Sequence, residues 1–290
     1  MIDSDKYGFV GLGDMGGPMA ANLARGGFRL IVYDKAGTEN RAPSGVEVGV
    51  GIADVARGAR VVFVSVPDAA ASLDVARSLV AVEDRNTQTL INLSTVGVEA
   101  TGPIVKTLVD SGVDYVDAPV SGGRAGAIRG TVTIMWSGSA ERMELIRPVL
   151  DSFAGSVFFV GATPGQGQAM KLLNNYLSAV AMTATSEAIA FGLSHGLNMK
   201  TMLDVANVST GQNSATQDKF PNRILTSTYD AGFRMALMDK DVALYLSEAK
   251  DAGTPVSLCE RVATYWQKGM KQFPDGDFTE IFKVIRDEIG

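Results

Sequence analysis

The segment GQGQAMKLLNN, residues 165–175, carries one lysine and two amides at the spacing of successive helical turns. Asn174 and Asn175 follow Lys171 by three and four residues, so all three side chains share one face if the segment is helical. A lysine amine can exchange a proton with a substrate, and amides can orient it. These residue types at this spacing indicate acid/base chemistry on one small molecule.

A nucleotide-binding fingerprint lies near the start of the chain. Gly11, Gly13 and Gly16 form GxGxxG between the apolar run YGFV and a helical pattern, and Asp34 ends the next apolar run. The first glycine permits a tight turn, the second lets a pyrophosphate approach the backbone, and the third lets the helix pack on the strand. A carboxylate at the position of Asp34 binds an adenosine ribose and repels a 2′-phosphate. NAD is therefore favoured over NADP, although Lys35 weakens this preference.

The candidate cofactor contacts extend beyond these glycines. They comprise the whole loop (Gly11, Leu12, Gly13, Asp14, Met15 and Gly16), together with Asp34. The strand ends SVPD and NLSTV should edge the same crevice, because ligands bind at the carboxyl ends of parallel strands. Val66, Pro67 and Thr95 are further candidates for this reason. The alternative is an ordinary strand-to-helix turn, with Asp34 as a solvated strand end.

Lys171 has an ordinary alternative too, because most helical lysines reach solvent. Its immediate neighbours, however, are small or apolar, and the segment follows a Gly/Pro-rich break, where pockets form. A partly buried lysine beside a cationic nicotinamide would have a lowered pKa. A general acid/base that works near neutral pH requires such a pKa.

The segment DAPVSGG, residues 117–123, also follows an apolar run. Ser121, Gly122 and Gly123 can present a hydroxyl and several backbone amides to an anion, for which a carboxylate would be suitable. A Gly-rich connector stabilised by a serine turn is the alternative. Arg124 follows directly, and its guanidinium could hold a second anionic or polyhydroxy group of a substrate; it could equally face solvent.

The elements that position these residues follow from the apolar pattern. Short β-rich runs alternate with amphipathic helical patterns over residues 7–161, which predicts a doubly wound α/β domain with a parallel sheet covered on both faces. After the break GATPGQG the pattern is helical only. We expect one domain over residues 1–163 and an all-helical domain over 164–290, connected by a long helix. The predicted helices are 15–25, 69–80, 98–110, 140–153, 168–195, 200–207, 233–251, 255–272 and 278–288.

Composition narrows the classes of function. The 290-residue chain is 46% hydrophobic and 20% charged, as a globular protein in water is. Its net charge of −6 offers no basic field to nucleic acid or to an anionic membrane. One cysteine and one histidine give neither a disulfide nor a zinc cluster, so no metal is expected. Without a signal sequence or an uninterrupted apolar run of about 18 residues, a cytoplasmic protein outside the membrane is predicted.

Four motifs in order resemble those of the β-hydroxyacid dehydrogenase family. They are GFVGLGDMGGPMAANL at residues 8–23, DAPVSGGRAGAIRGT at 117–131, GQGQAMKLLNN at 165–175 and DKDVAL at 239–244. The resemblance covers nearly the whole chain. It implies an N-terminal Rossmann domain that binds NAD, an all-helical C-terminal domain that contributes to substrate binding and oligomerisation, and a homodimer or homotetramer.

The same resemblance implies roles for individual residues. Ser121, Gly122 and Gly123 would hold the substrate carboxylate, and Lys171 would be the catalytic acid/base. Asn175 would orient the substrate with Asn174 beside it, and Lys240 would close the site near nicotinamide and substrate. The implied activity is hydride transfer between NAD, with NADP as the alternative, and a small anionic 3-hydroxy acid or its semialdehyde, as in 3-hydroxyisobutyrate dehydrogenases.

Three other classes remain as alternatives. An NADPH-dependent semialdehyde or imine reductase shares the architecture, although imine reductases generally lack the lysine and its asparagines. A non-catalytic nucleotide-binding sensor would not need Lys171, Asn175 and Ser121 together. A sugar-phosphate dehydrogenase is disfavoured, because the chain is short and its C-terminal part has no evident cluster of Arg and His for a phosphate.

Overall fold

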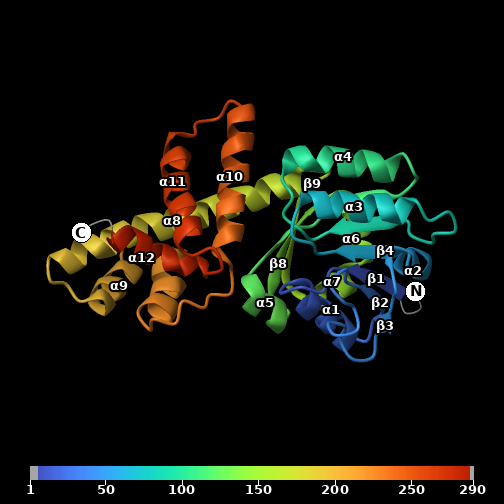
Figure 1. Ribbon diagram of the computed structural model, residues 1–290, viewed down its shortest axis with the longest axis horizontal. Helices are drawn as coiled ribbons and strands as arrows, with labels where there is room; N and C mark the ends of the chain where they lie inside the picture. Colours follow the sequence, from blue (N-terminus) through green and yellow to red (C-terminus); the bar gives the residue numbers. More distant parts are fainter. Residues whose placement is uncertain (1–5, 288–290) are drawn as a thin grey trace. The chain divides into compact units, whose positions relative to one another are not determined.

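The computed structural model describes residues 6–287 (Figure 1). Residues 1–5 and the end of the last predicted helix, including Glu288, lie outside this range. The chain divides into two compact units, Met1–Lys171 and Leu172–Gly290.

Unit 1 is built on one sheet. Its strands are β1 (Lys6–Val10), β2 (Arg29–Tyr33), β3 (Glu47–Val48), β4 (Val61–Val64), β5 (Thr89–Asn92), β6 (Asp114–Asp117), β7 (Val120–Ser121), β8 (Val132–Ser137) and β9 (Ala154–Gly161). The described strands follow the order β3-β2-β1-β4-β5-β6-β8-β7, and β9 pairs with β8. The run from β3 to β6 is parallel throughout. The carboxyl ends of these strands therefore meet at one edge, where ligands bind in such sheets.

Helices cover both faces of this sheet (Figure 1). They are α1 (Gly16–Arg25), α2 (Ile52–Gly58), α3 (Ala69–Val80), α4 (Val98–Val109), α5 (Gly123–Arg129), α6 (Ala140–Leu145) and α7 (Arg147–Asp151). Alternate strand residues point to opposite faces, so Phe9 packs with Met19 of α1 and Val10 packs in the cluster that contains Leu79 of α3. Two hydrophobic cores result, and the predicted doubly wound class is confirmed.

Unit 1 differs from the prediction in several details, among them the unpredicted helices α2 and α5. Strand β8 runs antiparallel to β6 and β7, so the sheet is not parallel throughout. The predicted helix 140–153 is two helices, because Pro148 lies in the first turn of α7 and has no N–H to continue the hydrogen bonding of α6.

Unit 2 is helical, as predicted. The long helix α8 (Gln166–Ser194) begins in unit 1 and continues into unit 2, and it is followed by α9 (Met199–Asn207), η1 (Ala215–Ile224), α10 (Met235–Asp251), α11 (Ser257–Gln272), η2 (Phe278–Glu280) and α12 (Ile281–Arg286). Trp266 and Phe220 are fully buried in its core. Helix α8 is the one helix among residues 6–287 that is long and apolar enough to cross a membrane, but 44% of its most apolar window is buried inside the protein.

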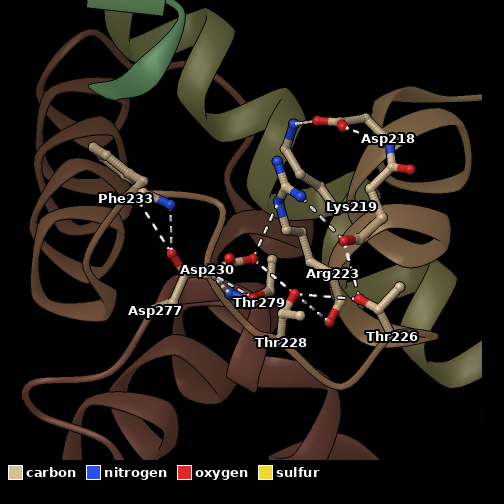
Figure 2. Close-up of polar contacts among 11 residues, drawn as sticks. Asp218, Lys219, Arg223, Thr226, Thr228, Asp230, Phe233, Asp277 and Thr279 are labelled. Atoms are coloured by element: carbon tan, nitrogen blue, oxygen red, sulfur yellow. Dashed lines mark hydrogen bonds and ion pairs between the residues drawn. The ribbon is translucent and has the colours of Figure 1, made fainter. Parts of the chain in front are cut away.

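The π-helix η1 was not predicted, since the sequence here is rich in polar residues and contains Pro221. Polar contacts hold the connection from η1 to α10 (Figure 2). Arg223 pairs with Asp230 at 3.4 Å, and the Asp277 carboxylate accepts the N–H groups of Gly232 and Phe233. These contacts fix a turn in which Ser227 and Tyr229 have positive φ angles, which side-chain-bearing residues rarely adopt.

Candidate active site

The glycines of the first loop have three different environments. Gly11 has a φ of +93°, which favours glycine, and a Cβ there would lie 2.1 Å from the carbonyl oxygen of Ser65. A Cβ at Gly13 would meet no atom within 4 Å, so the backbone faces open space that a pyrophosphate could enter. A Cβ at Gly16 would lie 2.0 Å from the Gly11 carbonyl oxygen, so only glycine lets α1 approach β1 this closely. This geometry fits a bound dinucleotide.

Asp34 lies beside this loop, at the end of β2. Its carboxylate accepts the N–H groups of Leu12 at 2.6 Å and Ala36 at 2.7 Å. Arg41, which sequence reasoning missed, places a guanidinium nitrogen 3.9 Å from the same carboxylate. An acid in this position selects NAD, whereas a nearby arginine can accommodate the 2′-phosphate of NADP. The contacts of Asp34 thus favour NAD, and Arg41 is a residue through which NADP could bind.

The ends of β4 and β5 are connected at the carboxyl edge of the sheet. The N–H of Val66 donates to the hydroxyl of Ser94 at 2.9 Å, and the N–H of Ser94 donates to the Asn92 side chain at 3.0 Å. Thr95, the next residue, is half-buried, and Pro67 is exposed. The structure therefore brings the predicted contacts of these two strands to neighbouring positions.

The Ser-Gly-Gly segment lies where β7 leads into α5. Gly122 and Gly123 have φ angles of +131° and +62°, so the backbone turns sharply after Ser121. Ser121 is half-buried and Gly122 is exposed. Arg124 lies in the first turn of α5 and is exposed. The helix α5 was not predicted, because the turn residues before it resemble a simple connector.

Lys171 lies near the start of α8, within unit 1, and is only 7% exposed. Gln168, one turn earlier, is fully buried and bonds to the loop after β5. It also donates to Asp117 at the end of β6. Asp117 and Gln168 belong to two of the sequence motifs, but the motifs predict no role for them. A polar residue at the end of an apolar run and another at the start of an apolar helix indicate that each needs a hydrogen-bond partner if buried, but they do not indicate which residues pair.

Burial raises the pKa of the Asp117 carboxyl, although hydrogen bonds from Tyr115, Gly165, Gln168 and Ser137 oppose this effect. Burial also raises the pKa of the Tyr115 phenol well above its ordinary value, and the neighbouring Asp117 charge adds to the shift. The phenol donates to Asp117 at 2.6 Å and accepts from Asn92 at 3.3 Å. Tyr115 is therefore a hydrogen-bond donor to Asp117 in this site.

A second polar cluster lies in unit 2, between α8 and α10. The side-chain amide of Asn175 donates to the Asp241 carboxylate at 2.5 Å, and Asn174 donates to the side-chain oxygen of Asn175 at 3.1 Å. Lys240 Nζ lies 3.4 Å from the other oxygen of Asp241, which is itself buried. The structure thus groups three of the predicted residues, Asn174, Asn175 and Lys240, around Asp241, a residue that sequence reasoning did not single out. Burial raises the pKa of Asp239, the residue before Lys240.

Comparison with known proteins identifies both parts of the chain. Residues 6–161 match the family described as the NAD binding domain of 6-phosphogluconate dehydrogenase. Residues 165–285 match the family described as NAD-binding of NADP-dependent 3-hydroxyisobutyrate dehydrogenase.

Individual relatives cover almost the full length. The 2-(hydroxymethyl)glutarate dehydrogenase of Eubacterium barkeri is 33% identical over 93% of this chain and 90% of that protein. The 3-hydroxyisobutyrate dehydrogenase of Pseudomonas aeruginosa is 33% identical over 96% of this chain and 97% of that protein. A Mycobacterium tuberculosis 3-hydroxyisobutyrate dehydrogenase structure with L-serine has a TM-score of 0.87 and 28% identity, and covers 97% of this chain and 99% of that one.

Proposed function

The chain belongs to the β-hydroxyacid dehydrogenase family, and we propose that Lys171 is the general acid/base of its reaction. The protein is an NAD(P)-dependent oxidoreductase that acts on the CH–OH group of a small hydroxy acid. The observation that supports the role of Lys171 is its burial in unit 1, the unit that carries the nucleotide-binding loop. Burial of an amine costs free energy, which makes a buried lysine near a nucleotide-binding loop a candidate functional group.

The proposed mechanism assigns one task to each group. Lys171, with a neutral amine, takes the proton of the substrate hydroxyl as the C–H bond breaks, and it returns this proton in the reverse direction. The bound nicotinamide supplies the hydride acceptor. Ser121 and the backbone of Gly122 and Gly123 hold the substrate carboxylate.

The unit 2 residues orient the substrate in this proposal. The hydrogen bond to Asp241 fixes the side chain of Asn175, with Asn174 beside it, so that Asn175 presents a constant geometry to a ligand. Lys240 adds a positive charge that favours an anionic substrate. Its contact with Asp241 holds this charge close to the amides.

The substrate is proposed to be a 3-hydroxy acid or its semialdehyde that carries a further anionic or polyhydroxy group. Arg124 supports this extension, because it directly follows the carboxylate-binding segment and is exposed. No carboxylate among the described residues pairs with it. A guanidinium can bind such a group through two parallel hydrogen bonds.

The cofactor is NAD, with NADP as a second possibility. We propose that NAD is preferred, because the Asp34 carboxylate is fixed by the loop amides and would repel a 2′-phosphate. Lys35 and Arg41 supply positive charge that could hold the 2′-phosphate of NADP. NADP would therefore bind, but less tightly than NAD.

We propose that two copies of the chain pair through α8 as a homodimer or as part of a homotetramer. Leu173, Leu177 and Phe191 are 44%, 58% and 65% exposed, and Ala184 and Ala188 are exposed between them. This uncharged stripe follows one face of the helix at intervals of three, four and seven residues. The same stripe on a second copy would be self-complementary about a two-fold axis. Sedimentation of Leu177→Glu as a monomer would support the pairing, and an unchanged assembly would contradict it.

A cytoplasmic location is also proposed. The net charge of −6 does not favour an anionic membrane surface. Buried polar side chains such as Thr183 and Ser186 lie along α8, which is expected of a helix packed within a protein. Recovery of the protein in the membrane fraction after cell lysis would contradict this location.

The test is a set of initial rates with NAD and NADP. The panel contains 3-hydroxyisobutyrate, 2-(hydroxymethyl)glutarate, L-serine, hydroxysulfonates, sugar acids and the matching semialdehydes. Activity with one hydroxy acid in the presence of NAD would identify the substrate. Activity confined to imines with NADPH would favour an imine reductase, and no turnover with any substrate would favour a nucleotide sensor.

A further inference from the structure

The first turn of α8 is bound to the ends of two strands by fully buried side chains. The Asp117 carboxylate, at the end of β6, accepts the N–H of Gly165 and the side-chain amide of Gln168, the latter at 3.2 Å. The hydroxyl of Ser137, at the end of β8, accepts the N–H of Gly167 at 3.0 Å. The first N–H groups of a helix have no partner within the helix. Here side chains from distant strands accept the N–H of Gly167 in the first turn and that of Gly165 just before it.

Gln168 extends these contacts to the loop after β5. Its side-chain oxygen accepts the N–H groups of Val96 at 2.9 Å and Gly97 at 3.3 Å. Its side-chain amide donates to the carbonyl oxygen of Ser94 at 3.1 Å. These partners lie on both sides of Thr95, a candidate cofactor contact. One buried side chain thus connects the cofactor-facing loop with the helix that carries Lys171 three residues later.

Close packing restricts the same helix turn. A Cβ at Gly167 would lie 2.7 Å from the carbonyl oxygen of Met135 in β8 and 3.1 Å from the Asp117 Cβ. Backbone cannot yield as a flexible side chain can, so any larger residue must move the start of α8. Together, the hydrogen bonds and the close packing allow the first turn of α8 only one position relative to the sheet.

We propose that Asp117, Ser137 and Gln168, here called the Asp117 cluster, are positioning residues for Lys171. The cluster sets the distance between the lysine amine and the cofactor-facing loop around Thr95, and its members contact neither substrate nor cofactor. The inference rests on the proposed role of Lys171. A displacement of about 1 Å at a reacting group can cost about 100-fold in rate, so the cluster should control turnover more strongly than cofactor affinity.

The experiment uses Gln168→Met in the full-length protein. This change keeps a long side chain and removes the hydrogen bonds of Gln168 to Val96, Gly97, Ser94 and Asp117. The control is Thr87→Val, which removes two buried hydrogen bonds to the carbonyl oxygens of Ala56 and Ala59 in the same unit. The measurements are kcat, the Kd for NAD, the melting temperature and the primary isotope effect on kcat. The isotope effect compares the hydroxy acid with its form deuterated at the CH–OH carbon, and it reports how far hydride transfer limits turnover.

The expected result for Gln168→Met is a fall in kcat of about 10-fold to 100-fold, a larger isotope effect, and a Kd for NAD changed by less than about twofold. The control should keep kcat and the isotope effect of the wild type. A fall in kcat that is matched by a smaller folded fraction, with an unchanged isotope effect, would overturn the proposal.

A second variant covers the case in which Gln168→Met does not fold. Gly167→Ala removes no polar group, but its added methyl group displaces the start of α8. The same fall in kcat and the same rise in the isotope effect are therefore expected. Full activity of a folded Gly167→Ala or Gln168→Met, with Lys171→Ala inactive, would overturn the positioning role alone. Retained turnover in Lys171→Ala would overturn the proposed function, and the positioning role with it.

Discussion

The Asp117 cluster in unit 1 and the charged cluster of Asp218, Lys219, Arg223 and Asp230 in unit 2 (Figure 2) use similar polar groups in opposite ways. The first is fully buried and connects residues far apart in the chain: Gly165 bonds to Asp117 across 48 residues, and Val96 bonds to Gln168 across 72. The second is partly exposed and local, with Lys219 paired to its neighbour Asp218.

This difference teaches where polar contacts control geometry. A buried group that loses its partner costs about 1–3 kcal/mol, so each member of the Asp117 cluster enforces one arrangement of strand ends and helix. Exposed ion pairs contribute about 0–1 kcal/mol, so the charged cluster shapes a surface turn without restricting the chain elsewhere. Substitutions in the first region should change catalysis, and those in the second should not.

Lys171→Ala should have the largest effect. Removal of a general acid/base reduces kcat about 10²-fold to 10⁴-fold, while the nucleotide-binding loop remains intact. The measurement is steady-state turnover together with the Kd for NAD by fluorescence. The variant Lys219→Ala, which removes a lysine from the charged cluster, is the control and should retain activity. Comparable losses in both variants would contradict the distinction between the two regions.

Asp34→Ala should have the next largest effect, on the cofactor. The N–H of Leu12 would lose its acceptor, so the Kd for NAD should rise about 10-fold. Because the carboxylate also repels a 2′-phosphate, the Kd for NADP should rise less or fall, and the preference for NAD should narrow. Titration of both cofactors checks this. An NAD:NADP affinity ratio equal to that of the wild type would show that Asp34 does not select the cofactor.

Arg124→Ala and Arg223→Ala compare one exposed arginine near the Ser-Gly-Gly segment with one in the charged cluster. Loss of a charge-assisted hydrogen bond should raise the KM of an anionic substrate about 10-fold in the first variant. The second variant should keep the wild-type KM, since Arg223 is already paired with Asp230. An unchanged KM for every active substrate in Arg124→Ala would refute the substrate contact.

Asp218→Asn should have the smallest effect, on stability alone. Partial burial pushes the pKa of Asp218 up, but hydrogen bonds from Lys219 and Asn222 and the charges of Lys219 and Arg223 outweigh this, so the pKa lies below its ordinary value. The carboxylate therefore stabilises the folded state at pH values above the ordinary pKa of an aspartate side chain. This stabilisation is lost as the pH falls through the folded-state pKa of Asp218.

We accordingly expect Asp218→Asn to lower the melting temperature by about 1–3 °C near neutral pH. The difference from the wild type should shrink as the pH falls from about 5 to about 3. Calorimetric scans across this range measure it. A difference that grows in acid would reverse the assigned sign.

Much of the fold could be predicted from the sequence, because apolar periodicity is a local property. Helix α3 has the predicted bounds, and the doubly wound class followed from alternating runs. The break between α6 and α7 follows from Pro148, which the prediction of one helix over residues 140–153 does not take into account. The π-helix η1 was not predictable, because its hydrogen bonds depend on packing against the rest of unit 2 and not on residue preference.

The candidate site divides in the same way. The roles expected of Gly11, Gly13 and Gly16 depend on backbone geometry that glycine spacing indicates. The contact of Gln168 with Val96 joins residues 72 apart in the chain, and that of Asp241 with Asn175 joins residues 66 apart. Without coordinates, nothing in a single sequence connects such residues. The long-range polar contacts were therefore the part that sequence reasoning missed.

The central claim is hydride transfer between NAD and a hydroxy acid, with Lys171 as the acid/base. The most direct test is to incubate the enzyme and NAD with its active hydroxy acid deuterated at the CH–OH carbon, and to analyse the reduced cofactor by mass spectrometry. Deuterium in the reduced nicotinamide for the wild type, and none for Lys171→Ala within the same time, is the predicted result. Reduced cofactor without deuterium, or equal labelling in both proteins, would contradict the account.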